Sequence, residues 1–318
     1  MYSIVVASFS VLVFSLSAAA QSGGGLFPPT LAGPPGRSLL RINSEYVGDQ
    51  GLDDSESYHS HQHSVTTMPA GSGLFLSAGY GQTKIKQEPL VLEDGVEVDN
   101  NLKSMLFQVG WAQAVTQGST WSAQIGFGAN SDRPFERSDD DAYTVSLMNL
   151  RPGTTGRWIL GAFYNSNFGF GDFPVPIIGY LYSPSKKFNL IVGAPFVRLS
   201  WGGFVGTRLT MGVSPGGASA GLSQSVLGPF AIEARWSWEV ENYFHEARLD
   251  EDDQFYIQKQ QALIGLRAPV IPGGMLRIYY SYRYNSSYYQ AESQFDRPEQ
   301  RFELRDSGGL STSLSLSY

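Results

Sequence analysis

The sequence predicts an all-β protein, a transmembrane antiparallel up-and-down β-barrel of about sixteen strands. Apolar and polar residues alternate over most of the chain after residue 38, which is typical of strands with two different faces. Charged residues make up only 16% of the chain, whereas soluble domains average roughly 25%. After the first 20 residues no apolar run approaches the roughly 20 residues that a transmembrane helix requires. A closed barrel is the other structure that satisfies its backbone in lipid.

The N-terminal segment predicts export. Residues 2–20 hold an apolar run that ends in small residues, so we expect a signal peptide over 1–20 with cleavage before Gln21. No Lys or Arg precedes Arg37, and this weak n-region leaves an uncleaved anchor as the alternative. Residues 21–37 form a Gly/Pro-rich leader, and residues 38–318 form the single barrel domain. The chain contains no cysteine, which excludes disulfides and a lipid-modified cysteine.

Alternation and turn residues predict the strands in chain order. The first eight strands are expected at 38–47, 59–68, 72–84, 103–114, 119–130, 142–150, 157–166 and 173–182. The second eight are expected at 187–194, 195–201, 204–213, 218–226, 230–242, 255–268, 274–286 and 308–318. The least regular are 59–68, 218–226 and the pair that meets at Pro195, so the range is twelve to sixteen strands. Short turns and long, often acidic loops alternate between them, and a bacterial barrel has its short turns on the periplasmic side.

The strand at 230–242 shows how the two faces are assigned. Trp236 and Trp238 share one face with Val240, while Glu233 and Glu239 lie on the other. In a membrane barrel the tryptophans face lipid and the charges face the lumen. Trp111, Trp121, Trp201 and Tyr284 lie toward strand ends, as an interfacial aromatic girdle requires.

The last strand carries the most specific pattern. Leu314, Leu316 and the terminal Tyr318 lie on one face, and serines occupy the other. This resembles the C-terminal signal of bacterial outer-membrane proteins, in which a terminal aromatic residue follows alternating apolar residues. The resemblance implies that the barrel assembly machinery recognises this strand.

Residues 173–201 (FPVPIIGYLYSPSKKFNLIVGAPFVRLSW) resemble the central segment of a family of uncharacterised bacterial outer-membrane β-barrel proteins, a domain of unknown function. The resemblance covers 173–318 well and the N-terminal half loosely. It implies a barrel in the outer membrane of a Gram-negative-type bacterium, in contact with outer-membrane lipid. It implies no catalytic residue.

The inward face of the predicted strands collects charge. The expected lumen-lining residues are Arg41, Glu45, Arg198, Arg208, Glu233, Arg235, Glu239, Lys259, Arg267, Arg277 and Arg283. In one interpretation opposite charges on neighbouring strands pair and stiffen the wall. In the other they form a constriction that selects small solutes by the sign of their charge. A barrel of about sixteen strands is wide enough to leave an aqueous channel.

Three histidines form the one candidate metal site. His59, His61 and His63 occupy alternate positions, so a strand projects all three to one side. Imidazoles ligate zinc or copper where a further group completes the shell. The alternative is a polar strand end without metal.

Catalytic motifs are weak. Gly217 to Gly221 matches G-x-S-x-G, but neither a following helix nor a triad is apparent. His245 lies in an acidic segment, where a barrel hydrolase could use it as an acid or base, but a solvated histidine is the commoner case. The sequence therefore favours a protein that is not an enzyme.

We expect a passive, porin-like channel for small hydrophilic solutes, without a cofactor. The alternatives left open are a structural or surface-interaction barrel with a closed lumen, and an outer-membrane barrel enzyme. A net charge of −7 argues against nucleic-acid binding, for which a basic patch is the typical footprint. Acidic loops at 139–141 and 250–253 are expected to attract cations at the mouth.

Overall fold

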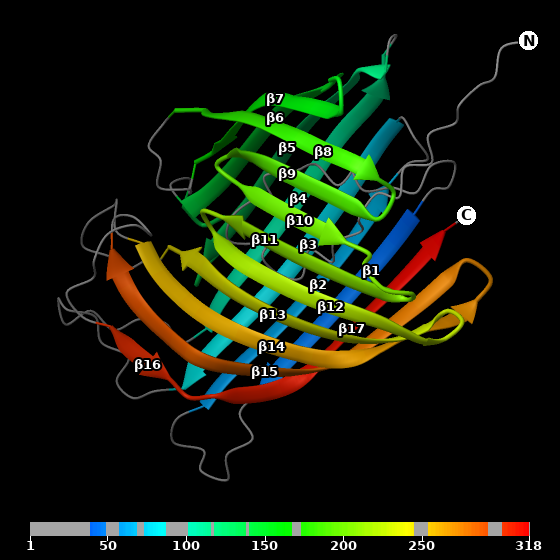
Figure 1. Cartoon of the computed structure of the whole chain (residues 1–318). Coiled ribbons are helices and arrows are strands. Elements are labelled where there is room, and N and C mark those ends of the chain that lie inside the picture. The colour runs from blue at the N-terminus through cyan, green and yellow to red at the C-terminus, as the bar shows by residue number, and fades with distance from the viewer. Residues whose placement is uncertain are drawn as a thin grey trace, which may run out of the picture.

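The computed structural model of the protein is a closed barrel of antiparallel strands (Figure 1). It describes residues 39–48, 57–68, 73–86, 101–115, 118–137, 140–166, 173–244, 254–291 and 301–317. The expected signal peptide and leader lie outside these residues. No helix among the described residues is long and apolar enough to cross a membrane.

Seventeen strands are present in the described part of the chain. They are β1 (Leu39–Gly48), β2 (Ser57–Met68), β3 (Gly73–Lys86), β4 (Asn101–Ala114), β5 (Thr120–Ser131), β6 (Asp141–Pro152), β7 (Gly156–Asn165), β8 (Val175–Ser185), β9 (Phe188–Ala194), β10 (Val197–Trp201), β11 (Thr207–Ser214), β12 (Gly217–Leu227), β13 (Phe230–Tyr243), β14 (Gln254–Ile271), β15 (Gly274–Ala291), β16 (Phe302–Leu304) and β17 (Ser307–Ser317).

Sixteen of these strands form the wall. Each pairs with its neighbour in sequence from β1 to β15, β15 pairs with β17, and β17 closes the ring against β1. In the closing pair Leu40 lies opposite Leu316 and Tyr46 lies opposite Leu310. The predicted up-and-down barrel is therefore confirmed, and closure leaves the wall without a free edge.

All sixteen predicted strands are present at the predicted places. The added strand, β16, pairs only with β15, and its three residues are too short to produce an alternating pattern. β15 ends at Ala291 rather than at residue 286, because a bulge lets the pairing continue. One extra residue of β15 is accommodated between the Gln260–Tyr284 and Gln258–Ser287 pairs, and Asn285 there has a φ of 47°. Asparagine tolerates this left-handed conformation better than most residues do.

The connections follow the predicted asymmetry with two exceptions. The predicted pattern requires a long loop after every odd-numbered strand. Instead, β9 joins β10 through Pro195 and Phe196, and β11 joins β12 through Pro215 and Gly216. The wall strands next to the first of these connections are short, since β9 has 7 residues and β10 has 5, whereas β14 and β15 have 18 each. In Figure 1 the long strands β13 to β15 curve around one side of the barrel.

The two faces of the wall differ as a membrane barrel requires. Outward-facing side chains are large, apolar and exposed, with Leu266 at 63% of its full exposure. Inward-facing side chains include charged groups that are almost fully buried, with Lys259 and Arg283 at 1%. Apolar residues outside and buried polar residues inside invert the arrangement of a soluble protein. The interior of the barrel is therefore the place to look for a functional site.

Candidate functional site

Four arginines gather around one glutamate in the half of the lumen next to the short turns. On β13, Arg235 Nη2 lies 3.2 Å from Glu233 Oε2. From the next two strands, Arg267 Nη1 lies 3.4 Å from Glu233 Oε1 and Arg277 Nε lies 3.8 Å from Glu233 Oε2. Arg41 of β1 lies within electrostatic range of Arg235 and Arg277. This basic cluster therefore carries more positive than negative charge.

Two further contacts orient the basic cluster. The Tyr279 hydroxyl donates a hydrogen bond to Glu233, and the Arg235 guanidinium lies over the Tyr279 ring, 4.8 Å from its centroid. Glu233 is buried, while the side chains of Arg235 and Arg267 each retain 26% exposure. The charge that remains exposed in this half of the lumen is therefore the positive one.

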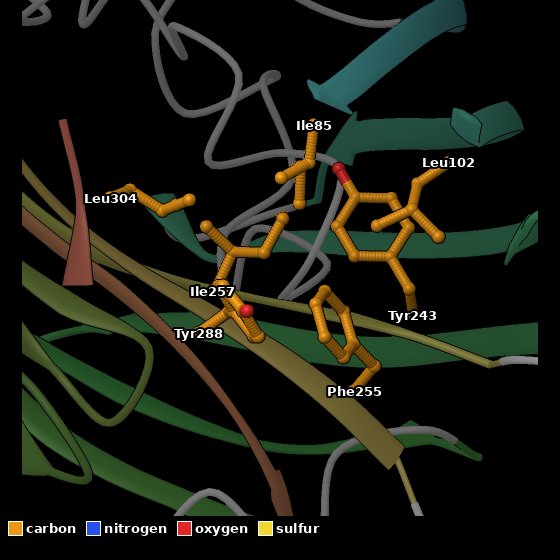
Figure 2. Packing of buried hydrophobic residues seen from close by; sticks show 7 residues of the cluster. All are labelled: Ile85, Leu102, Tyr243, Phe255, Ile257, Tyr288 and Leu304. Atoms are coloured by element: carbon orange, nitrogen blue, oxygen red, sulfur yellow. The ribbon is translucent and has the colours of Figure 1, made fainter. Parts of the chain in front are cut away.

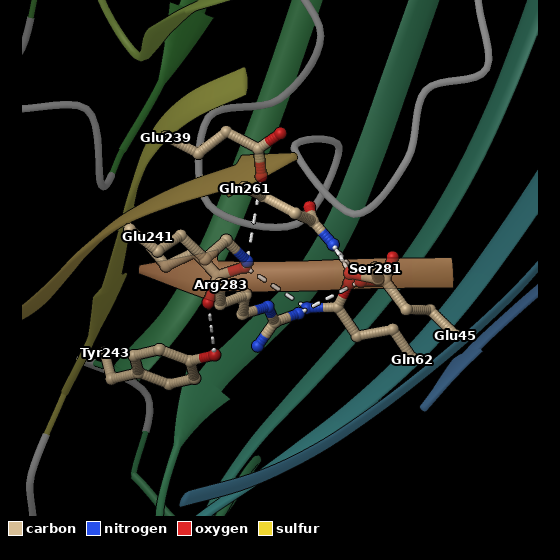
Figure 3. A network of polar contacts seen from close by, with 9 residues as sticks. Glu45, Gln62, Glu239, Glu241, Tyr243, Gln261, Ser281 and Arg283 are labelled. Atoms are coloured by element: carbon tan, nitrogen blue, oxygen red, sulfur yellow. Dashed lines mark hydrogen bonds and ion pairs between the residues drawn. The ribbon is translucent and has the colours of Figure 1, made fainter. Parts of the chain in front are cut away.

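A second polar network occupies the half of the lumen nearer the long loops, and it spans the lumen (Figure 3). Lys259 of β14 pairs with Glu241 and lies 3.7 Å from Glu239, both on β13. Gln62 of β2 donates to Glu241 at 3.2 Å, although the two strands are not neighbours in the sheet. The network thus links opposite sides of the barrel.

The same network continues to β1. Glu45 Oε1 accepts hydrogen bonds from Gln261 Nε2 at 2.5 Å and from Arg283 Nη2 at 3.2 Å. Gln261 also donates to Ser281 at 2.5 Å, and Tyr243 donates to Glu241 at 3.2 Å. These groups are buried, so their side chains occupy this part of the interior.

An apolar cluster continues this filling toward the long-loop end (Figure 2). Its buried members come from β3, β4 and β13 to β16: Ile85, Leu102, Tyr243, Phe255, Ile257, Tyr288 and Leu304. Because β3 and β4 do not neighbour β13 to β16 in the sheet, the cluster bridges the lumen. The Phe244 amide, just after β13, donates to the Asn130 carbonyl of β5 at 2.7 Å. The interior between β13–β15 and β1–β5 is therefore closed in this half.

The bulge at Asn285 helps to close the interior of the barrel in the long-loop half. Tyr282 and Tyr284 face outward before the bulge, and uninterrupted alternation would also turn Tyr288 outward. The extra residue reverses the facing, and Tyr288 enters the apolar cluster with its ring 5.4 Å from that of Phe255. A bulge that re-aims a side chain toward a functional region is a known use of this irregularity.

A second apolar cluster lines the opposite wall, on β6 to β8 and the β9–β10 connection. Its buried members are Met148, Leu150, Ile159, Phe163, Ile177 and Phe196. These side chains pack against one another along one wall, and none of them belongs to β11 or β12. The interior thus has an apolar wall on β6–β10 and a charged wall on β13–β15 and β1.

Between these two walls, β11 and β12 present only small side chains along most of their inward faces. Thr210, Gly212, Ser214, Gly217, Ser219, Gly221 and Ser223 all face inward and stay partly exposed. A Cβ placed on Gly212 would meet only Ser219 Oγ at 3.6 Å and the Val197 carbonyl at 3.8 Å, both on neighbouring strands of this wall. We call this strip the small-residue floor, and the space in front of it is open.

Two arginines bracket the small-residue floor. Arg198 of β10 pairs with Gly212 of β11, and Gly212 pairs in turn with Ser219 of β12. Arg198 therefore borders the floor on the β10 side. Arg235 lies opposite Gly221 and borders it on the other side. Arg208 faces inward at the short-turn end of β11 and is exposed. The open part of the lumen is therefore lined by small polar groups and by arginines.

The predicted lumen residues divide into three groups. Arg235, Arg267 and Arg277 join Glu233 in the basic cluster, and Lys259, Arg283 and Glu239 belong to the buried network. Arg198 and Arg208 adjoin the small-residue floor. Both interpretations of the inner charges have counterparts here, since some ions pair across strands while arginines beside the floor remain accessible.

Sequence reasoning missed several members of the buried network. Glu241 extends the inward series of Glu233 and Glu239 by two residues, so continued alternation could have found it. Gln62 and Gln261 are neutral and gave no signal in a search for charge. Their partners lie across the lumen, and contacts of that kind have no local pattern in the sequence.

The three histidines share one face, as predicted, and that face points outward from β2. His63 Nδ1 lies 3.0 Å from Ser44 Oγ, and the His61 ring lies tilted against that of Tyr46, with the centroids 5.0 Å apart. No group of three His, Asp or Glu residues in the described ranges is arranged to hold a metal ion.

The remaining predicted sites are only partly described. Leu314 and Leu316 face outward on β17, and Tyr318 lies outside the described residues. Ser219 of the G-x-S-x-G match lies within strand β12, so the strand-to-helix turn of a nucleophile elbow does not occur there. His245 and the acidic loop at 250–253 also lie outside the described residues.

No protein-family model matches the sequence, and no curated protein matches it. Among solved structures, the chain is similar to an outer membrane channel from Pseudomonas putida F1, with 8% identity, a TM-score of 0.37 and coverage of 90% of this chain and 97% of that one. The translocator domain of the autotransporter NalP from Neisseria meningitidis is 13% identical, with a TM-score of 0.34 and coverage of 90% of both chains. OccAB3 of Acinetobacter baumannii is 8% identical, with a TM-score of 0.32 and coverage of 89% of this chain and 99% of that one. Nothing about this chain's activity follows from overlaps this low.

Proposed function

We propose that the protein spans the outer membrane of a Gram-negative-type bacterium and passes small hydrophilic solutes passively, with a preference for anions. The observation that carries this proposal is the small-residue floor of β11 and β12 between Arg198 and Arg235. The floor provides space, and the arginines provide a positive potential beside it. Charged groups at a narrow part of a pore select solutes by sign.

The outward face supports the membrane location. Trp111, Trp121, Trp158 and Trp201 are exposed, point outward and lie near the short turns. Tyr282 and Tyr284 are outward-facing aromatic residues farther along β15, toward the long loops. Apolar side chains fill the face between these levels, as they do in barrels with aromatic girdles at both membrane interfaces. In water this face would expose more contiguous apolar surface than soluble monomers usually carry.

The preference for anions follows from which charges are accessible. Arg208 is exposed at the short-turn end, Arg198 is partly exposed, and Arg235 and Arg267 keep a quarter of their side-chain surface. The carboxylate of Glu233 is buried beneath its arginine partners. A confined lumen with low-dielectric walls concentrates the field of such groups and raises the local concentration of ions of opposite sign.

Reversal potentials in planar bilayers test this function. Under a KCl gradient, we expect the full-length protein to conduct and to favour chloride over potassium. Arg198→Glu combined with Arg208→Glu should shift the reversal potential toward potassium, because both charges adjoin the open floor. Lys186→Glu, on the exposed turn between β8 and β9, is the control and should leave the preference almost unchanged. Cation preference in the unaltered protein, or an equal shift in the control, contradicts the proposal.

A second candidate function is a surface-interaction barrel whose lumen stays closed. The buried network and the apolar cluster favour it, because both join opposite walls in the long-loop half. In this case a folded preparation, verified by heat-modifiable gel mobility, carries no current. Conductance in the same preparation excludes the closed barrel, so one experiment separates the two functions.

A further inference from the structure

The outward face of β2, β3 and β4 changes along its length. Near the short turns it is apolar, with Val65, Leu76 and Trp111 exposed. Toward the long loops it becomes basic: His59 lies directly opposite Lys84, and Lys103 lies opposite Gln82 on the same strand as Lys84. Side chains at directly opposite positions are roughly 5 Å apart at Cβ.

His61 belongs to the same basic surface, since it lies opposite Gln82 and within electrostatic range of His59 and Lys84. We call His59, His61, Lys84 and Lys103 the outer basic patch. They occupy three strands that lie side by side in Figure 1. Lys84 is exposed, and the other three side chains are partly exposed.

No carboxylate of the surrounding strands offsets this charge. The only acidic residue of β1 to β4 is Glu45, which faces the lumen and pairs with Arg283 at 3.2 Å. Between the lysines, the Gln82 side-chain amide donates to Asn101 at 2.6 Å, so a neutral pair fills that position. Within the described residues of these four strands, the lipid-facing side therefore carries the positive charge of the outer basic patch and no carboxylate.

From this arrangement we propose that the outer basic patch binds the phosphate groups of a phosphorylated glycolipid of the outer leaflet. The inference rests on the proposed outer-membrane location, with the long loops at the cell surface. One ligand matches both parts of the face: acyl chains lie against Val65 and Leu76, and phosphates reach Lys84 and Lys103. A free anion would gain nothing from the apolar part.

Neighbouring side chains suit a headgroup region. Tyr46 of β1 is exposed, and its ring lies tilted against that of His61 with the centroids 5.0 Å apart. Tyrosine is common where hydrocarbon meets headgroups. Lysine stems lie along apolar surface while their ammonium groups reach the polar layer.

Lipid binding by the full-length protein in a zwitterionic detergent tests the inference. Native mass spectrometry is used to titrate diphosphorylated lipid A, with phosphatidylethanolamine as the zwitterionic comparison. We expect tighter binding of lipid A. Because each lysine near a phosphate-rich surface contributes a factor of about five in affinity, Lys84→Gln with Lys103→Gln should weaken lipid A binding about 25-fold. Lys186→Gln with Lys187→Gln, on the opposite end of the barrel, is the matched control and should not weaken it.

Three results overturn the inference: equal lipid A affinity in the patch variant and the unaltered protein, equal losses in patch and control variants, or displacement of lipid A by inorganic phosphate at matched concentration. The last result would show a site for free phosphate instead of a lipid. Conductance is measured on the same preparations, because the patch lies outside the lumen. Lost lipid binding with unchanged current supports the inference, and an absent current with intact lipid binding contradicts only the proposed channel.

Discussion

Individual charges inside the barrel are stabilised by partners from other strands. Lys259 illustrates this, since its ammonium group is fully buried and faces Glu239 and Glu241 on β13. An ion removed from water loses several kcal/mol of hydration, and only a close opposite charge with further hydrogen bonds compensates for that loss. Gln62 and Tyr243 supply such bonds to Glu241.

Removal of one partner from this network should destabilise the barrel. Lys259→Met leaves two buried carboxylates without their cation, and we expect a loss of about 3–5 kcal/mol in the free energy of unfolding. Urea unfolding of the protein in lipid vesicles measures this free energy. Lys187→Met is the control, because Lys187 is exposed on a turn and its loss should change little. Similar values for both variants would show that the network is not buried as described.

Two adjacent residues of β13 test the assignment of the faces. Trp236 points outward and is the seventh of the strand's 14 residues, and Ser237 points inward. Arg in place of Trp236 should cost about 2–4 kcal/mol near the bilayer midplane. It also removes the hydrogen bond from Trp236 Nε1 to the Tyr284 hydroxyl at 3.0 Å. Ser237→Arg should be tolerated in the same unfolding measurement, and equal costs would contradict the facing.

At the scale of the strand, small residues decide where the lumen stays open. β11 and β12 place glycine, serine or threonine at the inward positions along the floor, while β6–β8 and β13–β15 carry large side chains there. Space in this barrel therefore depends on two of its sixteen wall strands. The floor also separates the apolar wall from the charged wall.

A bulky residue on the floor should narrow the passage. Gly212→Phe projects a ring into the open space, because a Cβ there meets no atom of the opposite wall within 4 Å. We expect the single-channel conductance to fall at least twofold with little change in stability. Ala220→Phe on the outward face of β12 is the control and should conduct like the unaltered protein. Equal conductance in all three would place the solute path elsewhere.

The strands were predictable from sequence because alternation is a local property. Trp236 and Ser237 already show it, and the same pattern located every strand of the wall. The alternation lapses after Tyr284, and the predicted strand therefore ends at 286. That lapse does not distinguish a strand end from a bulge, so the bulge at Asn285, which turns Tyr288 into the lumen, was not predicted. The short connections at Pro195 and Pro215 agree with the predicted strand bounds. They depart only from the expected alternation of short turns and long loops, which is an average over barrels.

Contacts across the lumen lie beyond sequence reasoning for a different reason. Glu45 and Arg283 are far apart in the chain, and only the curvature of the closed wall brings them within 3.2 Å. The sequence predicted that both residues line the lumen. It left open whether such charges pair or select solutes, and the structure places ion pairs in both halves and partly or fully exposed arginines beside the floor.

At the scale of the whole molecule, the barrel combines a closed region with an open one. Side chains of β13–β16 meet those of β1–β4 in the long-loop half, while the small-residue floor leaves space along β11 and β12. The account depends on one claim above all: the inward face of this wall is wet and the outward face contacts lipid.

Thiol accessibility on β12 measures that claim most directly, and the chain's lack of cysteine makes every introduced thiol unique. Ser219→Cys and Ala220→Cys are placed in planar bilayers and treated with a charged, membrane-impermeant methanethiosulfonate while the current is recorded. The account predicts that the reagent modifies the residue 219 thiol and reduces the current, and that the residue 220 thiol does not react. Reaction at 220 with none at 219 would contradict the assigned faces, and modification at 219 without a change in current would contradict a solute path along this floor.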